Sequence, residues 1–162
     1  MADYRKMWEE LGMDLETHDQ LCEVLPQAFG DVYLSQENRP EGMDYYNFVV
    51  AEIHGVRPAE LIEHQKKGGK VFGTFCVYVP DEVVFAADAI ATGLCGGSQF
   101  WVPGGEKVLP TNTCPLIKAS VGARLDRTCP FFRIADMYVG ETTCDGKKKA
   151  WEILAEDVPV HV

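Results

Sequence analysis

Three cysteines of this 162-residue chain stand where a thiolate could bind a metal. Cys76 comes late in the run KVFGTFCVYVP, Cys114 opens CPLIKASVGARL, and Cys144 follows ADMYVGETT. Cys114 and Cys144 each precede a segment with helical periodicity, and a helix N-terminus carries partial positive charge and free N–H groups that favour a thiolate. The residue types and their placement therefore predict soft-metal ligands at Cys76, Cys114 and Cys144.

The spacing of these cysteines narrows the kind of metal site. Zinc ribbons and bacterial ferredoxins bring their ligands in CxxC pairs, whereas these three lie far apart in the chain. Such spacing fits a site assembled from separate strand ends, as an iron–sulfur site can be. For each of them a small buried residue stays the alternative. Of the other cysteines, Cys22 and Cys129 are expected in packing, and Cys95, beside two glycines, stays open between packing and binding.

The segment YLSQENRPEGMDYYNFVVAEIHG contains weaker candidates for catalysis, namely Ser35, Glu52 and His54. Glu52 and His54 are two residues apart, so on a helix they face different directions and do not form an evident catalytic pair. A capped and solvated helix is the alternative. The remaining histidines stand in charged or terminal contexts and are expected on the surface: His18, His64 and His161.

Composition bounds the class of protein. The length suits one domain, and 46% hydrophobic residues can form a core. A formal net charge of -10 argues against nucleic-acid binding. The charged first residues and the lack of a long apolar run predict a cytoplasmic protein without a membrane segment. In that compartment six cysteines are expected to stay reduced.

The elements that must position the cysteines change character near Gly68 and Gly69. Residues 1–69 predict a helical segment that packs on an α/β domain of residues 70–162. The helices of the first segment are expected at 3–11, 15–29, 43–54 and 58–67. In the second segment strands are expected at 70–80, 94–103, 135–142 and 158–162, with helices at 81–93, 114–125 and 144–157.

This alternation predicts a mainly parallel, Rossmann- or flavodoxin-like four-stranded sheet with flanking helices. Ligands of such sheets collect at the carboxyl ends of the strands, where the three cysteines are expected. The chain ends at Val162 within a strand pattern, which is an unusual place for the terminus of a buried parallel strand. We therefore expect an N-terminal part of a longer protein.

Several segments resemble the 2-hydroxyacyl-CoA dehydratase family, which includes 2-hydroxyglutaryl-CoA dehydratase, benzoyl-CoA reductase and the double-cubane cluster proteins. They are GKVFGTFCVYVPDEVVFAADAIATGLCGG, NTCPLIKASVG and VGETTCDGKKKAWEIL. The form TTCDGKKK, with MWEELGMDLETHD and YLSQENRPEGM, is most similar to the double-cubane branch. The resemblance spans nearly the whole chain but only the first part of a family subunit, so it implies a second α/β domain that is absent here.

The resemblance implies an oxygen-sensitive iron–sulfur protein of anaerobic metabolism, holding a [4Fe-4S] cluster or a double cubane. Low-potential electrons would come from an ATP-dependent activator, and a second subunit or a homodimer would complete the enzyme. A dehydratase (lyase) of the family acts on an acyl-CoA, whereas the double-cubane proteins resemble reductases of small molecules. The family's cluster cysteines correspond to Cys76 and Cys114, and Cys144 matches a recurrent family cysteine.

The remaining cluster ligands would lie outside this chain, so these residues alone are expected to be inactive. A different class of function stays open beside this one. The chain could instead be a non-redox α/β ligand-binding or regulatory domain whose cysteines are structural or bind zinc.

Three lysines follow Cys144 in the first turn of the expected helix, where the helix dipole disfavours each positive charge by roughly 0.3–1 kcal/mol. A nearby anion would offset this cost, and both a thiolate-bound cluster and the phosphates of a CoA ester are anionic. We therefore expect Cys144 to face a cluster pocket and at least one lysine to point to it or to the activator surface, with Lys147 and Lys148 as cofactor-binding candidates. A solvated helix face with a Lys148–Glu152 pair is the alternative.

Overall fold

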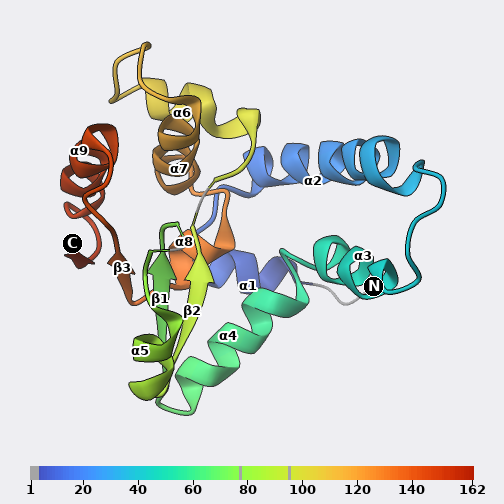
Figure 1. The fold of residues 1–162 in the computed structure, drawn as a ribbon, viewed down its shortest axis with the longest axis horizontal. Helices are drawn as coiled ribbons and strands as arrows, with labels where there is room; N and C mark the ends of the chain where they lie inside the picture. Colours follow the sequence, from blue (N-terminus) through green and yellow to red (C-terminus); the bar gives the residue numbers. More distant parts are fainter. Residues whose placement is uncertain (1–3, 77, 95) are drawn as a thin grey trace.

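The computed structural model describes residues 4–76, 78–94 and 96–162 (Figure 1). Cys95, whose role the sequence left open, lies outside these ranges. Helices occupy the first part of the chain, and strands and helices alternate after Lys70. The α/β architecture expected from the sequence is therefore confirmed.

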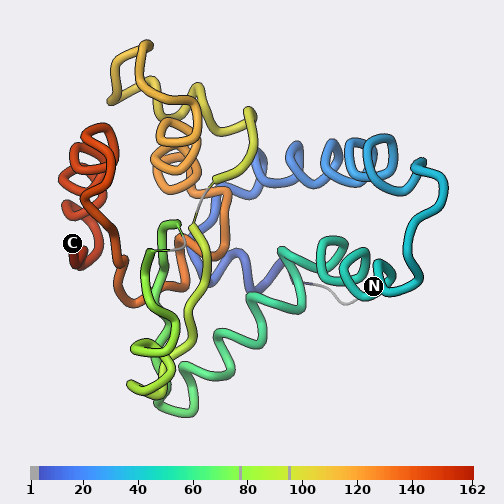
Figure 2. The backbone as a smooth tube through the Cα atoms, in the orientation of Figure 1, coloured from blue at the N-terminus to red at the C-terminus, as the bar shows by residue number. Residues whose placement is uncertain are grey.

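The elements of the first part are α1 (Arg5–Glu10), α2 (Leu15–Phe29), the π-helical turn η1 (Gly30–Leu34), α3 (Met43–Ala51) and α4 (Val56–Lys66). Helices α2 and α3, with η1 between them, form an arm that extends away from the sheet, whereas α4 packs on β1 (Lys70–Thr74) and α8 (Pro130–Ile134) (Figures 1 and 2). Helix α2 has the predicted bounds because Asp14 caps it, its side chain accepting a hydrogen bond from the Thr17 N–H at 3.1 Å. Gly30 does not end the helical path as expected, since the chain continues through η1 to Leu34.

The sheet has four parallel strands in the order β2-β1-β3-β4. They are β1 (Lys70–Thr74), β2 (Ala89–Gly93), β3 (Met137–Val139) and β4 (Val160–His161). This order equals the start of the flavodoxin-like order, in which the chain moves first to one side of β1 and later to the other. The β1/β3 pair is therefore the topological switch point, the place where ligands bind in open α/β sheets.

The position predicted for the second strand is wrong. Residues 81–93 were expected to be helical, but helix α5 (Asp81–Ala86) ends early and β2 follows it at Ala89–Gly93. Asp88 adopts a positive φ of 54°, which turns the chain between them. The segment expected as the strand, residues 94–103, instead contains a short 3-10 helix η2 (Gln99–Trp101), capped by Ser98, and the start of α6 (Val102–Glu106).

Helices α7 (Pro115–Leu125), α8 (Pro130–Ile134) and α9 (Asp145–Leu154) complete the fold. Helix α7 is central: it packs on α6 and α9, and its residues Ile117–Arg124 are buried. Gly122 makes the α6 contact possible, because an added Cβ would overlap the carbonyl oxygen of Trp101. Within the described ranges, none of these or the other helices is long and apolar enough to cross a membrane.

One carboxylate joins α4 to the two central strands. Asp136, just before β3, accepts hydrogen bonds from the Val71 N–H at 2.9 Å and Gln65 Nε2 at 2.8 Å. Lys70 Nζ donates to its other oxygen at 2.9 Å, and the Asp136 N–H donates to the Val71 carbonyl at 2.8 Å. These bonds fix β3 beside β1 at the end opposite to the switch-point edge.

Candidate functional site

The carboxyl ends of β1 and β3 bring two of the three sequence-predicted cysteines, Cys76 and Cys144, to one edge of the sheet. Cys76 comes two residues after the end of β1, and Cys144 is the N-cap residue of α9, which follows β3. Cys114 is the N-cap residue of α7. Cys76 and Cys114 are exposed, whereas Cys144 is half-buried. Strand β1 and two helix N-termini thus carry the three thiols.

Cys76 adopts a backbone conformation that is unfavourable for a residue with a side chain. Its φ is +65°, in the left-handed region that glycine prefers. Such a conformation costs on the order of 1 kcal/mol or more, and it persists where the surrounding structure imposes it, commonly at functional sites. The thiol is thereby held exposed at the mouth of a cavity.

The cavity has a volume of about 80 Å³ and lies between α7, α9 and the end of β1. Its walls are mostly apolar, with one thiol and one ammonium group among them. The lining residues are Phe75, Cys76, Leu116, Ile117, Ser120, Lys147, Ala150, Trp151 and Leu154.

Neither Cys144 nor Cys114 lines this cavity. A Cβ at Gly146 would lie 2.7 Å from Ile117 Cδ1, in the cavity wall, and 3.8 Å from Cys144 Sγ. Cys114 is two residues before Leu116, another lining residue. The structure therefore brings Cys76 and Lys147 together in the cavity and places Cys144 beside the cavity wall, whereas Cys114 is near a lining residue only in sequence.

Lys147 is the lysine that points into the cavity. Its side chain is 17% exposed and forms an ion pair with Glu141, which also accepts hydrogen bonds from the backbone and side chain of Thr143. Burial alone would lower the pKa of Lys147, but the bond to Glu141 and the nearby Cys76 raise it above its ordinary value. Burial likewise opposes ionisation of Glu141, yet Lys147 and Thr143 hold its pKa below the ordinary value. The cavity therefore contains a fixed ammonium charge beside Cys76.

The other two lysines lie on the outer side of α9. Lys148 pairs with Asp145 at 3.2 Å, and Lys149 pairs with Glu152. The Lys148–Glu152 pair of the solvated-face alternative is therefore not found, because Glu152 pairs with Lys149 instead. Lys148 does not line the cavity, so its role as a cofactor-binding residue stays a prediction.

The weaker catalytic candidates do not form one site. Ser35 Oγ donates to the Asp31 carbonyl at 2.6 Å, within its own helical turn. Glu52 accepts a hydrogen bond from Tyr4 at 3.4 Å. His54, in the turn between α3 and α4, contacts His18 instead of either residue.

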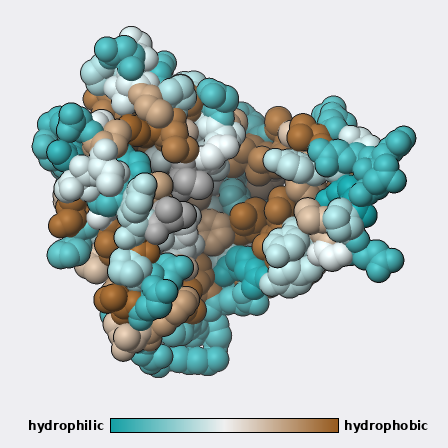
Figure 3. All heavy atoms as spheres, viewed as in Figure 1, coloured by the Kyte–Doolittle hydropathy of each residue, from teal (hydrophilic) through white to brown (hydrophobic). Residues whose placement is uncertain are grey.

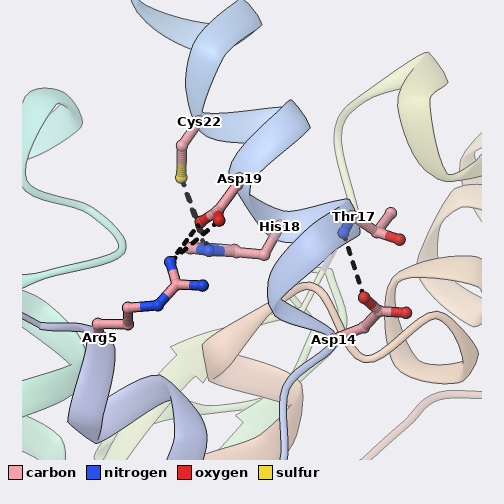
Figure 4. Close-up of polar contacts among 6 residues, drawn as sticks. All are labelled: Arg5, Asp14, Thr17, His18, Asp19 and Cys22. Atoms are coloured by element: carbon pink, nitrogen blue, oxygen red, sulfur yellow. Dashed lines mark hydrogen bonds and ion pairs between the residues drawn. The ribbon is translucent and has the colours of Figure 1, made fainter.

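His18 was expected on the surface, and that expectation is wrong. Its side chain is fully buried, and its Nε2 lies 2.9 Å from His54 Nδ1 and 3.5 Å from Cys22 Sγ (Figure 4 shows His18 and Cys22). Cys22 is half-buried, one helical turn after His18 on α2. Of the other histidines, His161 is exposed as expected, whereas His64 is half-buried with its Nε2 shielded from solvent.

Burial controls the ionisation of this second group of side chains. It lowers the pKa of His18, and burial together with the neighbouring His18 lowers the pKa of His54 to about 4. Burial also raises the pKa of Cys22. A metal ion could be shared by these three side chains, because their ligand atoms all lie within 4.8 Å of one another. Among the described residues, they form the group of His, Cys, Asp or Glu side chains that meets this condition. The i,i+4 spacing of His18 and Cys22 in the sequence indicates that these two side chains are neighbours on a helix. Nothing in the sequence indicates that His54 joins them.

Comparison with known proteins identifies the family of this chain. Residues 76–162, more than half of the chain, match the sequence model of the family described as 2-hydroxyglutaryl-CoA dehydratase, D-component. The matched segment begins at Cys76 and contains Cys114, Cys144 and Lys147.

A relative from Escherichia coli (strain K12), named as a dehydratase subunit, YjiM, is 45% identical over 102 residues. The aligned part is 63% of this chain and 27% of the relative, so this chain spans about a quarter of the length of that protein. The parallel sheet, the segment from Cys76 onward and this identity lead to one assignment: the chain belongs to the 2-hydroxyglutaryl-CoA dehydratase D-component family.

Proposed function

We propose that this chain is the part of a dehydratase-type subunit that holds an iron–sulfur cluster at the β1/β3 switch point. Thiolates of Cys76, Cys114 and Cys144 are its ligands on this side, and residues outside the 162 supply the others. The observation that carries the proposal is the cavity at the sheet edge in which an exposed, conformationally constrained Cys76 faces Lys147.

The residues at this edge fit such a group in type and placement. Cysteine thiolates are the usual ligands of iron–sulfur clusters, and these thiols come from three separate elements. Within the described ranges the three do not converge as closely as ligands of one ion do. A cluster does not need such convergence, since its thiolates bind different iron atoms.

The surrounding side chains have separate roles in the proposal. The apolar wall that Phe75, Ile117 and Trp151 provide keeps water away from the cluster-facing side of the cavity. Lys147, fixed by Glu141, offsets negative charge beside Cys76. Charge and solvent exposure are among the factors that set the potential of such groups.

A bound cluster supplies one-electron transfer at low potential. An ATP-dependent activator delivers the electron, and the exposed outer face of α9 with Lys148 and Lys149 is the surface offered to it. The whole enzyme, completed by a second subunit or a homodimer, eliminates water from a 2-hydroxyacyl-CoA or, if it follows the double-cubane branch, reduces a small molecule.

The test is anaerobic isolation of the full-length protein that contains these residues, with the subunits that co-purify with it, followed by iron and acid-labile sulfide analysis and EPR spectroscopy of the reduced sample. We expect iron and sulfide in equal amounts and the EPR signal of a reduced cluster. Cys76→Ala and Cys114→Ala should each lose most of this iron, because each removes a ligand.

Cys129→Ala is the matched control, because this thiol is buried and does not line the cavity. It should keep the iron content of the unaltered protein. An iron-free wild-type sample would refute the cluster proposal in favour of a non-redox function, and full iron content in both Cys76→Ala and Cys114→Ala would refute the ligand assignment.

A further inference from the structure

We propose that His18, Cys22 and His54 bind one divalent transition-metal ion, of which Zn²⁺ is the fitting representative, at the base of the α2–α3 arm. This site uses other elements and other residues than the cluster edge. It does not depend on the proposed function, because none of its three ligands comes from the segment 70–162.

The distances between the donor atoms are close to those of a tetrahedral zinc site. With Zn–N near 2.0–2.1 Å and Zn–S near 2.3 Å, tetrahedral angles place two nitrogens about 3.3 Å apart and a nitrogen and a sulfur about 3.5 Å apart. Here His18 Nε2 lies 2.9 Å from His54 Nδ1 and 3.5 Å from Cys22 Sγ. Small side-chain shifts therefore suffice to bring the three atoms around one ion.

The backbone already holds two of the ligands in a suitable arrangement. His18 and Cys22 are four residues apart on α2, so they lie on the same face of the helix, one above the other. Asp14 caps the first turn of α2 and fixes the position of His18 (Figure 4). The pairing of i and i+4 ligands on a helix is a recurrent arrangement of zinc sites.

The third ligand is fixed from the other side of the arm. The Trp8 indole N–H donates to the His54 carbonyl at 2.7 Å, and its ring packs edge-on against His18 with centroids 4.4 Å apart. Phe131 contacts the His54 ring from α8. Aromatic rings thus enclose the two imidazoles, while half-exposed Cys22 leaves a path for an ion to reach them.

Polar neighbours of the site are also in place. The Asp19 carboxylate, on the turn between the two ligands of α2, is engaged by Arg5 at 3.0 and 3.3 Å (Figure 4). Three protein ligands leave one position of a tetrahedral ion for water or another ligand, as in catalytic zinc sites. The ion would join α2 to the α3–α4 turn and so tie the arm together at its base.

The test uses Co²⁺ as a spectroscopic probe for the zinc site in a full chain that carries Cys76→Ser, Cys114→Ser and Cys144→Ser. This background removes the sheet-edge thiols, so failure of the cluster proposal does not affect the result. We expect one Co²⁺ per chain with the intense visible bands of tetrahedral cobalt and a thiolate-to-cobalt charge-transfer band, both of which Zn²⁺ displaces.

Variants of the ligands decide whether these residues are responsible. Cys22→Ser should abolish the charge-transfer band, and His54→Gln should weaken Co²⁺ binding by at least about tenfold, the lower bound for loss of even an outer-shell partner. His161→Gln, an exposed histidine on β4, is the matched control and should bind like the background.

Two results would overturn the proposal. One is the absence of a tetrahedral cobalt spectrum in the background protein, which would make the group a hydrogen-bonded packing cluster. The other is an unchanged charge-transfer band in Cys22→Ser, which would assign the thiolate to another cysteine. Far-UV circular dichroism of each variant shows whether it is folded. If Cys22→Ser does not fold, His54→Gln tests the site independently.

Discussion

Replacing Asp136 by Ala tests whether one carboxylate holds together the strands that form the switch point. The loss leaves the buried Val71 N–H without its side-chain partner, which costs about 1–3 kcal/mol. Gln65 keeps its bond to the Ile134 carbonyl, so its lost bond costs about 0.5–1.5 kcal/mol. Lys70 is 61% exposed, and its ion pair contributes about 0–1 kcal/mol.

These contributions predict that Asp136→Ala lowers the free energy of unfolding by about 1.5–5.5 kcal/mol. Urea unfolding followed by circular dichroism measures it, with an unchanged m-value expected because the folded state stays compact. Glu63→Ala is the matched control: this exposed carboxylate on α4 pairs only with Lys67 on the surface, so its loss should cost at most about 1 kcal/mol. If Asp136→Ala is as stable as Glu63→Ala, the carboxylate does not hold the strands.

The same residue makes stability depend on pH in a defined direction. Burial alone would raise the pKa of Asp136, but the hydrogen bonds from Val71, Gln65 and Lys70 outweigh it and lower that pKa below the ordinary 3.8. A lowered folded-state pKa contributes stability that is present above 3.8 and is lost as the pH falls below it. Asp136→Asn should therefore lose less stability than wild type on acidification below this value, and an identical acid dependence of the two proteins would refute the linkage.

Three further predictions follow from packing. Gly122→Ala should destabilise the fold by about 1–3 kcal/mol or more in urea unfolding, because its Cβ overlaps the Trp101 carbonyl and backbone has to shift; wild-type stability would refute the close helix contact. Tyr138→Phe should lower the free energy of unfolding by about 1–2 kcal/mol, since the buried hydroxyl donates a hydrogen bond to the Phe132 carbonyl at 2.6 Å. Burial raises the pKa of Tyr138 to about 12, so the same substitution should remove this late-titrating group from the tyrosinate absorbance titration. Iodoacetamide followed by peptide mass mapping should modify Cys129 later than the exposed thiols, because it is 7% exposed; early modification would contradict its burial.

Periodicity and capping signals predicted most of the fold. The bounds of α2 were correct because Asp14 and the apolar spacing that follows it are local features of the sequence. The alternation after Lys70 predicted a parallel sheet, and four parallel strands are found. Local signals suffice where an element's ends depend on its own residues.

The second strand shows where local signals fail. The residues AIATG, 89–93, continue a helical pattern but are held as a strand by pairing with β1, residue by residue from Lys70↔Ala89 to Thr74↔Gly93. A short apolar run fits either a helix or a strand, and here a partner distant in the sequence decides. The aromatic residues of 94–103 suggested a strand, but Ser98 caps a helical turn there.

The two candidate sites differ in the same way. The positions of Cys76 after β1 and of Cys144 after β3 could be predicted, because the carboxyl ends of parallel strands meet at one edge of a sheet. Cys114 follows α6 rather than the strand expected before it, and the role of all three thiols as ligands stays a prediction. The group of His18, Cys22 and His54 could not be predicted, because the turn after α3 has to fold back on α2 before the two imidazoles meet. Sequence spacing indicates neighbours on one helix but not the contact between two helices.

The exposed apolar side chains of the arm have a further consequence, for handling the protein. Val32, Tyr33, Leu34, Tyr46 and Phe48 are all at least half exposed. Figure 3 shows hydrophilic residues over most of the arm, with hydrophobic residues between them, chiefly toward the middle of the molecule. Exposed apolar side chains promote association of a protein in solution when they lie side by side.

The order of the strands sets the order of events during synthesis. Strand β1 pairs with β2 on one edge and with β3 on the other, where Phe72 is opposite Met137. Strand β3 leaves the ribosome only after the whole stretch from α5 to α8. Until then β1 has one edge unpaired, and pairing across so long a loop makes folding slow. The nascent chain therefore leaves one edge of β1 unpaired while residues 75–136 are made, and the switch-point edge with Cys76 takes shape only when β3 docks.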